Sequence, residues 1–141
     1  MRYFILILGL AGAVVSALAL QVHYSTATEP CSINAHWDCG VVNHSPFAVM
    51  HGVPVAAIGI AGYLVIAALG FLRQRFTLML VVFAAFCFAL RLTFIEELVL
   101  EVWCLYCVIS QTIIALILTL SLGWFATEYR RLRRIAEGSA A

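Results

Sequence analysis

The sequence has no lysine and few charged residues of any kind. Only 11% of its 141 residues are charged, whereas about a quarter are charged in an ordinary soluble protein. The hydrophobic content of 65% and the mean hydropathy of +1.06 are those of a chain that folds in lipid. The only dense basic run, at 130–134, directly follows an apolar segment, so no basic face for nucleic acid is expected. The scarcity of charge predicts a membrane protein.

Four apolar segments are long enough to form helices across a bilayer. We expect spans at about 3–22, 53–72, 76–95 and 103–125, because about 20 residues at a rise of 1.5 Å match a hydrocarbon core of roughly 30 Å. A cleaved signal peptide is the alternative for the first segment, but its apolar stretch exceeds the roughly 7–15 residues of a signal core. The predicted fold is an all-α membrane protein, with residues 1–141 forming one domain built as a four-transmembrane-helix bundle.

The arginines predict which side of the membrane each connection occupies. Arg2, the turn at 73–75 and the cluster at 130–134 belong on the cytoplasmic side by the positive-inside rule. The polar loop over about 23–52 and the acidic stretch after the third span then share the opposite, outer side. Both termini are expected in the cytoplasm.

Two pairs of cysteines fall on the predicted outer side, although five cysteines are too few for a disulfide-dense secreted domain. Cys31 and Cys39 lie in the loop, and Cys104 and Cys107 form a Cys-x-x-Cys motif at the outer end of the fourth span. Residues three apart on a helix are about 5 Å apart, close enough for a disulfide. Two pairs that meet can exchange, because a thiolate attacks a neighbouring disulfide. Cys87 stands alone in the third span and is expected to be a small packing residue.

Two interpretations without redox chemistry remain open. A zinc ion would need all four paired cysteines, or cysteines together with His36, His44 or His51, around one tetrahedral site, and the spacing permits this. The protein could instead be a non-enzymatic membrane protein, such as a transporter subunit, whose disulfides are structural. The zinc interpretation is weakened because one pair lies in an apolar helix. The structural interpretation is weakened because a disulfide that staples the loop does not explain the second pair.

Charged residues near the cysteines have both functional and ordinary interpretations. His36, Asp38 and His44 surround the loop pair, where they tune the thiol pKa or are simply solvated. Arg91 lies near the outer end of the third span, where it is expected to reach toward the headgroups or to pair with Glu96 or its neighbour at 97.

The sequence around the cysteines resembles the vitamin K epoxide reductase family in its bacterial membrane form. The resemblance rests on CSINAHWDCGVVNHSPFAVMHGVPVAAIGIAGY, followed two spans later by FIEELVLEVWCLYC. Its features are a Cys-x7-Cys pair, Ser45 six residues past Cys39, a Gly-x-Pro opening the second span, and the Cys-x-x-Cys motif. They cover most of the chain from Cys31 to about the fourth span.

The resemblance implies a bundle around a quinone (ubiquinone, menaquinone or a related compound), with the loop pair as a shuttle. Cys31 would receive electrons from a thioredoxin-like partner through a mixed disulfide, Cys39 would exchange with Cys104, and Cys107 would face the quinone. Ser45 matches a Ser/Thr position expected near the quinone-side cysteine as a hydrogen-bond donor, and an ordinary turn hydroxyl is its alternative. This chain has Gln111 where some members carry a tyrosine that contacts the quinone.

The implied activity is that of a membrane thiol:quinone oxidoreductase that reoxidises a periplasmic thioredoxin-like (DsbA-like) protein and so supports disulfide formation. The expected location is a bacterial cytoplasmic (inner) membrane, with the cysteine pairs on the periplasmic side. Many bacterial members carry a fused thioredoxin-like domain, whereas few residues follow 134 here, so the expected thiol partner is a separate protein. DsbB-type oxidoreductases also have four spans and two pairs, but they carry the pairs in the opposite order.

Overall fold

Apolar helices make up most of the structure, a computed structural model that describes residues 1–25 and 31–139. The four main helices are α1 (Arg2–Tyr24), α3 (Val55–Phe71), α4 (Arg75–Ile95) and α5 (Leu105–Ser139). In this part of the chain three helices are long and apolar enough to cross a membrane: α1, α5, and α4 together with the turn that extends it to Leu100. Helix α3 is also apolar but shorter, with 17 residues. At 1.5 Å per residue α3 is about 26 Å long, slightly less than a hydrocarbon core.

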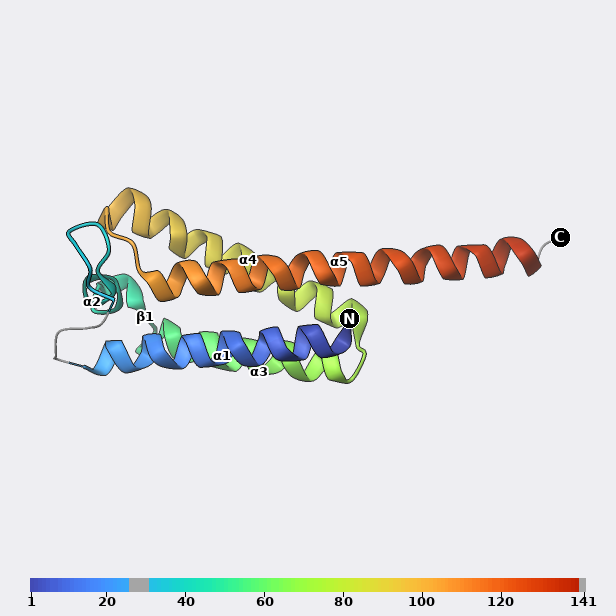
Figure 1. The fold of residues 1–141 in the computed structure, drawn as a ribbon, viewed down its shortest axis with the longest axis horizontal. Coiled ribbons are helices and arrows are strands. Elements are labelled where there is room, and N and C mark those ends of the chain that lie inside the picture. The colour runs from blue at the N-terminus through green and yellow to red at the C-terminus, as the bar shows by residue number, and fades with distance from the viewer. Residues whose placement is uncertain (26–30, 140–141) are drawn as a thin grey trace.

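Each of the four apolar segments is helical, and the largest departure from expectation is at the end of α5. The sequence predicts a span that ends near residue 125, but the helix continues without a break to Ser139. Arginine, leucine, alanine and glutamate are good helix formers, so the loss of apolar character after Phe125 ends the apolar segment and leaves the helix intact. Figure 1 shows α5 extending well beyond the other helices toward the C-terminus.

The helices place the two kinds of connection at opposite ends of the bundle. In Figure 1 the N-terminus, the α3–α4 turn and the C-terminal part of α5 point to one end, and the loop with the cysteines lies at the other. Helices α1 and α3 pack closely side by side because small residues face the neighbouring helix. A Cβ atom at Gly12 would overlap the ring of Tyr63, whose hydroxyl donates to the carbonyl oxygen of Ser110 on α5 at 2.8 Å. This contact ties three helices together beneath the cysteine end.

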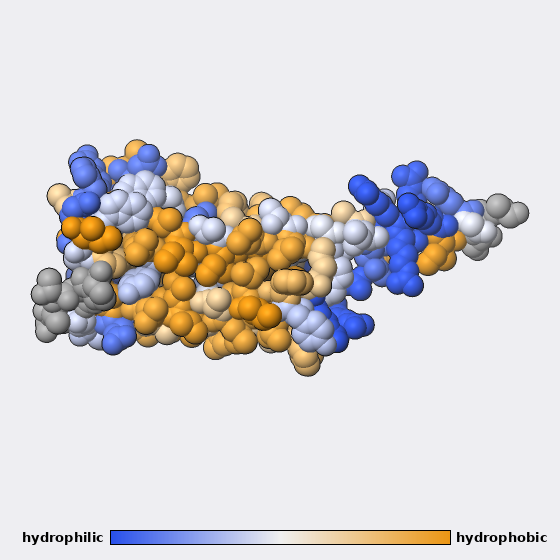
Figure 2. Space-filling view, viewed as in Figure 1, coloured by the Kyte–Doolittle hydropathy of each residue, from blue (hydrophilic) through white to orange (hydrophobic). Residues whose placement is uncertain are grey.

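The bundle has a thin core and a wide apolar exterior. Ile5, Ile66, Leu78, Val82 and Ile117 are buried at its centre. Many large apolar side chains are exposed instead, and Figure 2 shows them as a continuous apolar band, with hydrophilic residues at the two ends. An apolar surface of this extent is unfavourable in water and is expected of helices that contact lipid.

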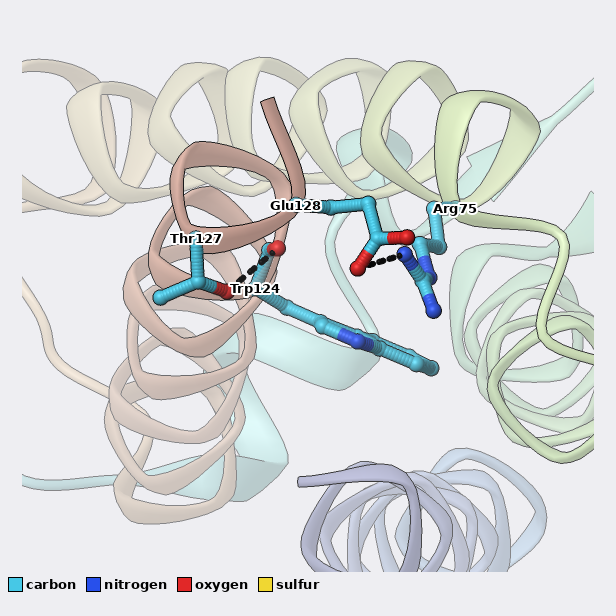
Figure 3. Close-up of polar contacts among 4 residues, drawn as sticks. All are labelled: Arg75, Trp124, Thr127 and Glu128. Carbon is cyan, nitrogen blue, oxygen red and sulfur yellow. Dashed lines mark hydrogen bonds and ion pairs between the residues drawn. The ribbon is translucent and has the colours of Figure 1, made fainter. Parts of the chain in front are cut away.

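A charged contact holds α4 against α5 at the arginine-bearing end. Arg75 and Glu128 form an ion pair at 2.7 Å, and the Arg75 guanidinium lies 4.9 Å from the centre of the Trp124 ring. Figure 3 shows the arginine and glutamate side chains pointing toward one another beside the indole. The contact lies where α5 begins to leave the bundle, so it fixes α5 at the point from which the free helical end extends.

The cysteine end contains short ordered elements that the all-α expectation omits. They are α2 (Cys39–Asn43), η1 (Pro46–Ala48), the antiparallel strands β1 (Val49–Met50) and β2 (Val53–Pro54), and the π-helical turn η2 (Glu96–Leu100) that continues α4. His51 and Gly52 join the strands with φ angles of 52° and 84°, the positive pair that a tight type I′ hairpin requires. The outer loop is therefore a small folded cap.

Candidate functional site

The loop cysteines form a disulfide within the described residues. The Cα atoms of Cys31 and Cys39 are 5.7 Å apart. Asp38 stabilises this part of the loop because its Oδ1 atom accepts hydrogen bonds from the Ser32 hydroxyl at 2.9 Å and from the Gly40 amide at 2.8 Å. The Ser32 hydroxyl, followed by the backbone amides at the start of α2, holds the pKa of this carboxyl below its ordinary value. Asp38 thus links the chain beside one cysteine to the helix that begins at the other.

Backbone pairing brings the loop against the segment that carries the second cysteine pair. Trp37 and Trp103 form a parallel bridge, in which the Asp38 amide donates to the Trp103 carbonyl at 3.1 Å and the Trp103 amide donates to the His36 carbonyl at 2.8 Å. The two indole rings lie 6.4 Å apart. Two segments more than 60 residues apart in sequence are held in register, and a cysteine lies just beyond each tryptophan.

Cys39 and Cys104 lie in one buried cluster with Cys31, and both are 0% exposed. Asn43, on the last turn of α2, spans the space between them. Its side-chain amide nitrogen donates to the Cys39 carbonyl at 2.9 Å and contacts the Cys104 sulfur at 3.5 Å. Asn43 therefore contacts one cysteine of each pair.

Cys104 and Cys107 are both free thiols at the start of α5. The side chains interact with one another. Cys104 precedes the first helical residue and is fully buried, whereas Cys107 lies in the first turn and is partly exposed. The structure thus holds an oxidised loop pair beside a reduced helical pair.

Glu96 interacts with both cysteines of the helical pair. Its carboxylate accepts the Cys104 backbone N–H at 3.1 Å, and Glu96 lines the same cavity as Cys107 and interacts with its thiol. The residue is only 3% exposed. Sequence reasoning considers Glu96 only as an ion-pair partner for Arg91, but Arg91 is exposed and Glu96 turns toward the cysteines. The signal that could have found it is an uncompensated acid at the end of an apolar span.

A cavity of about 360 Å³ opens between the helices next to Cys107. Most of its surface is apolar, with contributions from α1, α3, α4 and α5; examples are Val15, Ile66, Phe88, Leu92 and Ile114. Its polar residues gather at the cysteine end and include His23, Asn43, Ser45, Tyr63, Glu96, Cys107, Ser110 and Gln111. An apolar cavity with a few convergent polar groups is the usual form of a small-molecule site.

The two further residues that the resemblance assigns to a quinone both line this cavity. Ser45 is buried, and its hydroxyl donates to the Val42 carbonyl at 2.8 Å, so it also serves as the turn hydroxyl of the alternative interpretation. The Oε1 atom of Gln111 is buried and has no hydrogen-bond partner among the described residues. A buried amide oxygen without a partner is costly, and a ligand that supplies a hydrogen bond would satisfy it.

The structure places the remaining candidates away from the cysteines or gives them other roles. Cys87 lies exposed on α4 and is not a packing residue of this chain. His36 is exposed, and the His44 ring contacts the Gly40 carbonyl. Sequence reasoning missed His23, which contacts the Asn43 carbonyl and stacks against His44. Residues 1–25 and 31–139 contain no group of three or more potential metal ligands, and the disulfide engages two of the thiols that a zinc site would use.

Comparison with known proteins decides the family. The model of the vitamin K epoxide reductase family matches residues 3–122, which is most of the chain. The chain belongs to this family. A search of curated proteins finds no match. Vitamin K epoxide reductase family membership, together with the apolar helices and the Cys31–Cys39 disulfide, points to a membrane thiol-disulfide oxidoreductase.

Proposed function

We propose that this protein is a membrane thiol:quinone oxidoreductase that takes electrons from an extracytoplasmic thiol protein. The observation that carries the proposal is the contact between the two pairs: Cys39 and Cys104 share a buried cluster, and Cys107 lines an apolar cavity. A structural staple would need only the loop disulfide. The free thiols of the second pair have a use if they exchange with it.

The proposed route runs from the loop to the cavity. A partner thiolate attacks Cys31, which breaks the Cys31–Cys39 bond and releases Cys39. Cys39 then attacks Cys104 of a Cys104–Cys107 disulfide, which forms a Cys39–Cys104 bond and releases Cys107. The second thiol of the partner attacks the mixed disulfide, so the partner leaves oxidised and Cys31 is released. Cys31 then attacks Cys39, which re-forms the loop disulfide and releases Cys104. The state in the structure, with the loop pair oxidised and the helical pair reduced, is the product of this exchange. It is ready to reduce an acceptor in the cavity.

The cavity residues fit a quinone head group. A quinone bound there would accept two electrons and two protons and leave as a quinol. Gln111 would hold it, because an amide donates to a quinone carbonyl and its partnerless Oε1 atom accepts from a quinol hydroxyl. Cys107 lines the same wall, and the apolar side chains exclude water from the reacting groups. Ser45 lies at the cysteine end as a second donor once its bond to Val42 is released.

We further propose that all four helices cross the membrane, with the cysteine end on the periplasmic side of a bacterial inner membrane. The short helix α3 lies along α1 and is apolar throughout, which supports a crossing despite its length. The arginines at the opposite end of the bundle support a cytoplasmic location for that end. The proposed thiol partner is a separate thioredoxin-like (DsbA-like) protein that docks on the exposed loop residues 33–36 beside Cys31.

Purified protein with a reduced thioredoxin-like protein tests the function. Quinone absorbance and the thiol count are followed with ubiquinone-type and menaquinone-type acceptors. We expect quinone reduction in the wild type and its loss in Cys104→Ala and Cys107→Ala, whereas Cys87→Ala keeps most of the rate. If the cysteines never change redox state, or if the three variants lose activity equally, the proposed function is wrong.

A further inference from the structure

Glu96 is a buried acid that neither the family assignment nor the electron route uses. Carboxylates are almost never fully buried unless a partner compensates the charge. Among the described residues Glu96 has no arginine or histidine at ion-pair distance. Its partners are the Cys104 amide and the Cys107 thiol, and it also lines the cavity. A carboxyl group in this position lies between a reacting thiol and the proposed acceptor site.

The local fold turns Glu96 inward. The α-helix α4 ends at Ile95, and the wider π-helical turn η2 begins with Glu96. Glu101 then adopts a left-handed conformation with φ 53°, which reverses the chain so that Cys104 returns to the carboxylate. π-Helical turns are rare and frequently occur at functional sites. The neighbour Glu97 on the same turn is exposed, so the inward position belongs to Glu96 alone of this acidic pair.

We propose that Glu96 is a catalytic residue that accepts the proton of the Cys107 thiol and passes it to a quinone oxygen. This inference rests on the proposed function and adds the proton route to it. The ionised carboxylate removes the proton as the Cys107 thiolate forms, and the neutral acid then returns it within the cavity. A carboxyl that changes charge in this way does not need a permanent counter-ion.

The step balances in atoms and electrons. The thiols of Cys104 and Cys107 lose two electrons and two protons as the bond between their sulfurs forms, and the quinone becomes a quinol. One proton passes from Cys107 through Glu96 to a quinol oxygen. The Cys104 proton leaves to water, and water supplies the proton of the second quinol oxygen. The overall reaction is two thiols and one quinone to one disulfide and one quinol.

The other titratable groups around the cavity come from three helices. His23 on α1, Tyr63 on α3 and Tyr106 on α5 line it together with Glu96 and Cys107. The His23 ring is engaged with the Asn43 carbonyl, and the Tyr63 hydroxyl with Ser110. Glu96 differs from all three because its carboxylate is bonded to the Cys104 amide within the Cys-x-x-Cys segment and it interacts with Cys107, which lines the same cavity.

A purely structural role predicts a different result for the amide variant. As a cap, Glu96 would serve only to accept the Cys104 N–H at the start of α5. Glu96→Gln keeps an oxygen that can accept this bond but cannot take up a proton. A structural role therefore leaves Cys107 chemistry unchanged in Glu96→Gln, and a purely electrostatic one makes the thiol react faster because a nearby negative charge is removed.

The test measures how Cys107 reacts with iodoacetamide as a function of pH, without quinone, in the full chain carrying Cys104→Ala and Cys87→Ala. With Glu96 present, we expect the rate to rise in two steps, first as the carboxyl ionises and then as the thiol itself does. In Glu96→Gln we expect the first step to disappear and the rate at neutral pH to fall at least about tenfold, which is below the roughly hundredfold lower end of general-base effects in enzymes. Glu97→Gln is the matched control and should retain both steps.

An equal or faster rate in Glu96→Gln overturns the proposal. If Glu96→Gln does not fold, as judged by its helical circular dichroism, Glu96→Asp decides instead: it should keep the first step at a lower rate, and loss of that step is the contrary result. Quinone reduction with all cysteines present should fall about a hundredfold in Glu96→Gln, while exchange between the cysteine pairs keeps its rate. A wild type that reduces no quinone would refute the proposed function, and alkylation would still decide the role of Glu96.

Discussion

The two cysteine pairs lie side by side, yet their surroundings differ in almost every respect. The loop pair is oxidised and is held by a polar network in which Asp38 accepts from Ser32 and the start of α2. The helical pair is reduced, and its Cys107 lines an apolar cavity together with one buried acid, Glu96. The loop pair is thus buried beneath a polar network, whereas Cys107 of the second pair lies at the wall of a largely apolar cavity.

Under the proposed function, the difference lets one short chain join two redox partners. A thiol protein in water and a quinone in lipid would not meet, so each would need a cysteine pair in its own environment. Asn43 donates to the backbone carbonyl of Cys39 in one pair and contacts the sulfur of Cys104 in the other. The Trp37–Trp103 bridge fixes the register of the two segments. In the proposed route, transfer between the environments passes from Cys39 to Cys104, which lie in one buried cluster.

The largest expected effect comes from trapping the contact between the pairs. In the double variant Cys31→Ala/Cys107→Ala, Cys39 and Cys104 lose their usual partners but remain in one buried cluster. We expect a Cys39–Cys104 disulfide to form almost completely with a mild oxidant such as diamide. Peptide mass spectrometry after alkylation of the remaining thiols measures the bridged fraction.

The matched control for this trap retains Cys107 and removes Cys104. In Cys31→Ala/Cys104→Ala the thiols that remain at the cysteine end are those of Cys39 and Cys107, and Cys107 interacts with Glu96 at the cavity wall. This variant should bridge at least about ten times more slowly. Equal bridging in the two variants would mean that the loop does not select Cys104, and the comparison between the pairs would fail.

A smaller effect is expected from the residue that links the pairs. Asn43→Leu keeps much of the side-chain volume but removes the amide that contacts Cys39 and Cys104. A hydrogen bond of about 1–1.5 kcal/mol corresponds to a rate change of about tenfold if it acts only on alignment. We expect the rate of exchange between the pairs to fall by this amount. Rapid quenching and thiol counting measure this rate.

Two controls separate alignment from damage to the fold. Val41→Ala alters an exposed residue on the same short helix and should leave the exchange rate unchanged. Reduction of quinone by a pre-reduced Cys104–Cys107 pair should also keep its rate in Asn43→Leu. A loss in this second reaction would show that Asn43 supports the cavity and does not act between the pairs.

The helices are the part of this architecture that the sequence predicts well. Hydropathy is a local property, and the apolar segments that become α1, α3 and α4 begin and end within two residues of the expected bounds. The end of α5 is missed because Arg130 and the residues after it end the apolar character without breaking the helix. Family motifs in turn identify the four cysteines, Ser45 and Gln111, which the fold brings to one end.

What the sequence does not reveal depends on pairing across long distances. Trp37 and Trp103 join through backbone groups, which carry no residue-specific signal, so their bridge is invisible in the sequence. Asn43 and Glu96 acquire meaning only after the chain has folded back on itself. Glu96 is one of three acids in a short stretch, and only the π-helical turn distinguishes it from Glu97.

The smallest expected effect concerns the polar network of the loop pair. Asp38→Ala removes the side-chain acceptor for the Gly40 and Val41 amides at the start of α2, and loss of such a cap costs about 1 kcal/mol. We expect hydrogen exchange of these two amides to accelerate about fivefold, while amides near Cys107 are unaffected. Unchanged protection of both amides would show that the disulfide alone holds the loop.

The charge of Asp38 gives this prediction a pH dependence with a definite sign. Because Ser32 and the helix amides lower the pKa of Asp38 in the folded loop, its contribution is fully present above the ordinary value of about 3.9 and is lost as the pH falls through the lowered value. Exchange of Gly40, corrected for its intrinsic rate, should therefore lose protection in acid. Asp38→Asn keeps a good cap without the charge, so its protection should not change over the same interval. Parallel losses in both proteins would place the acid sensitivity elsewhere and leave Asp38 as a neutral cap.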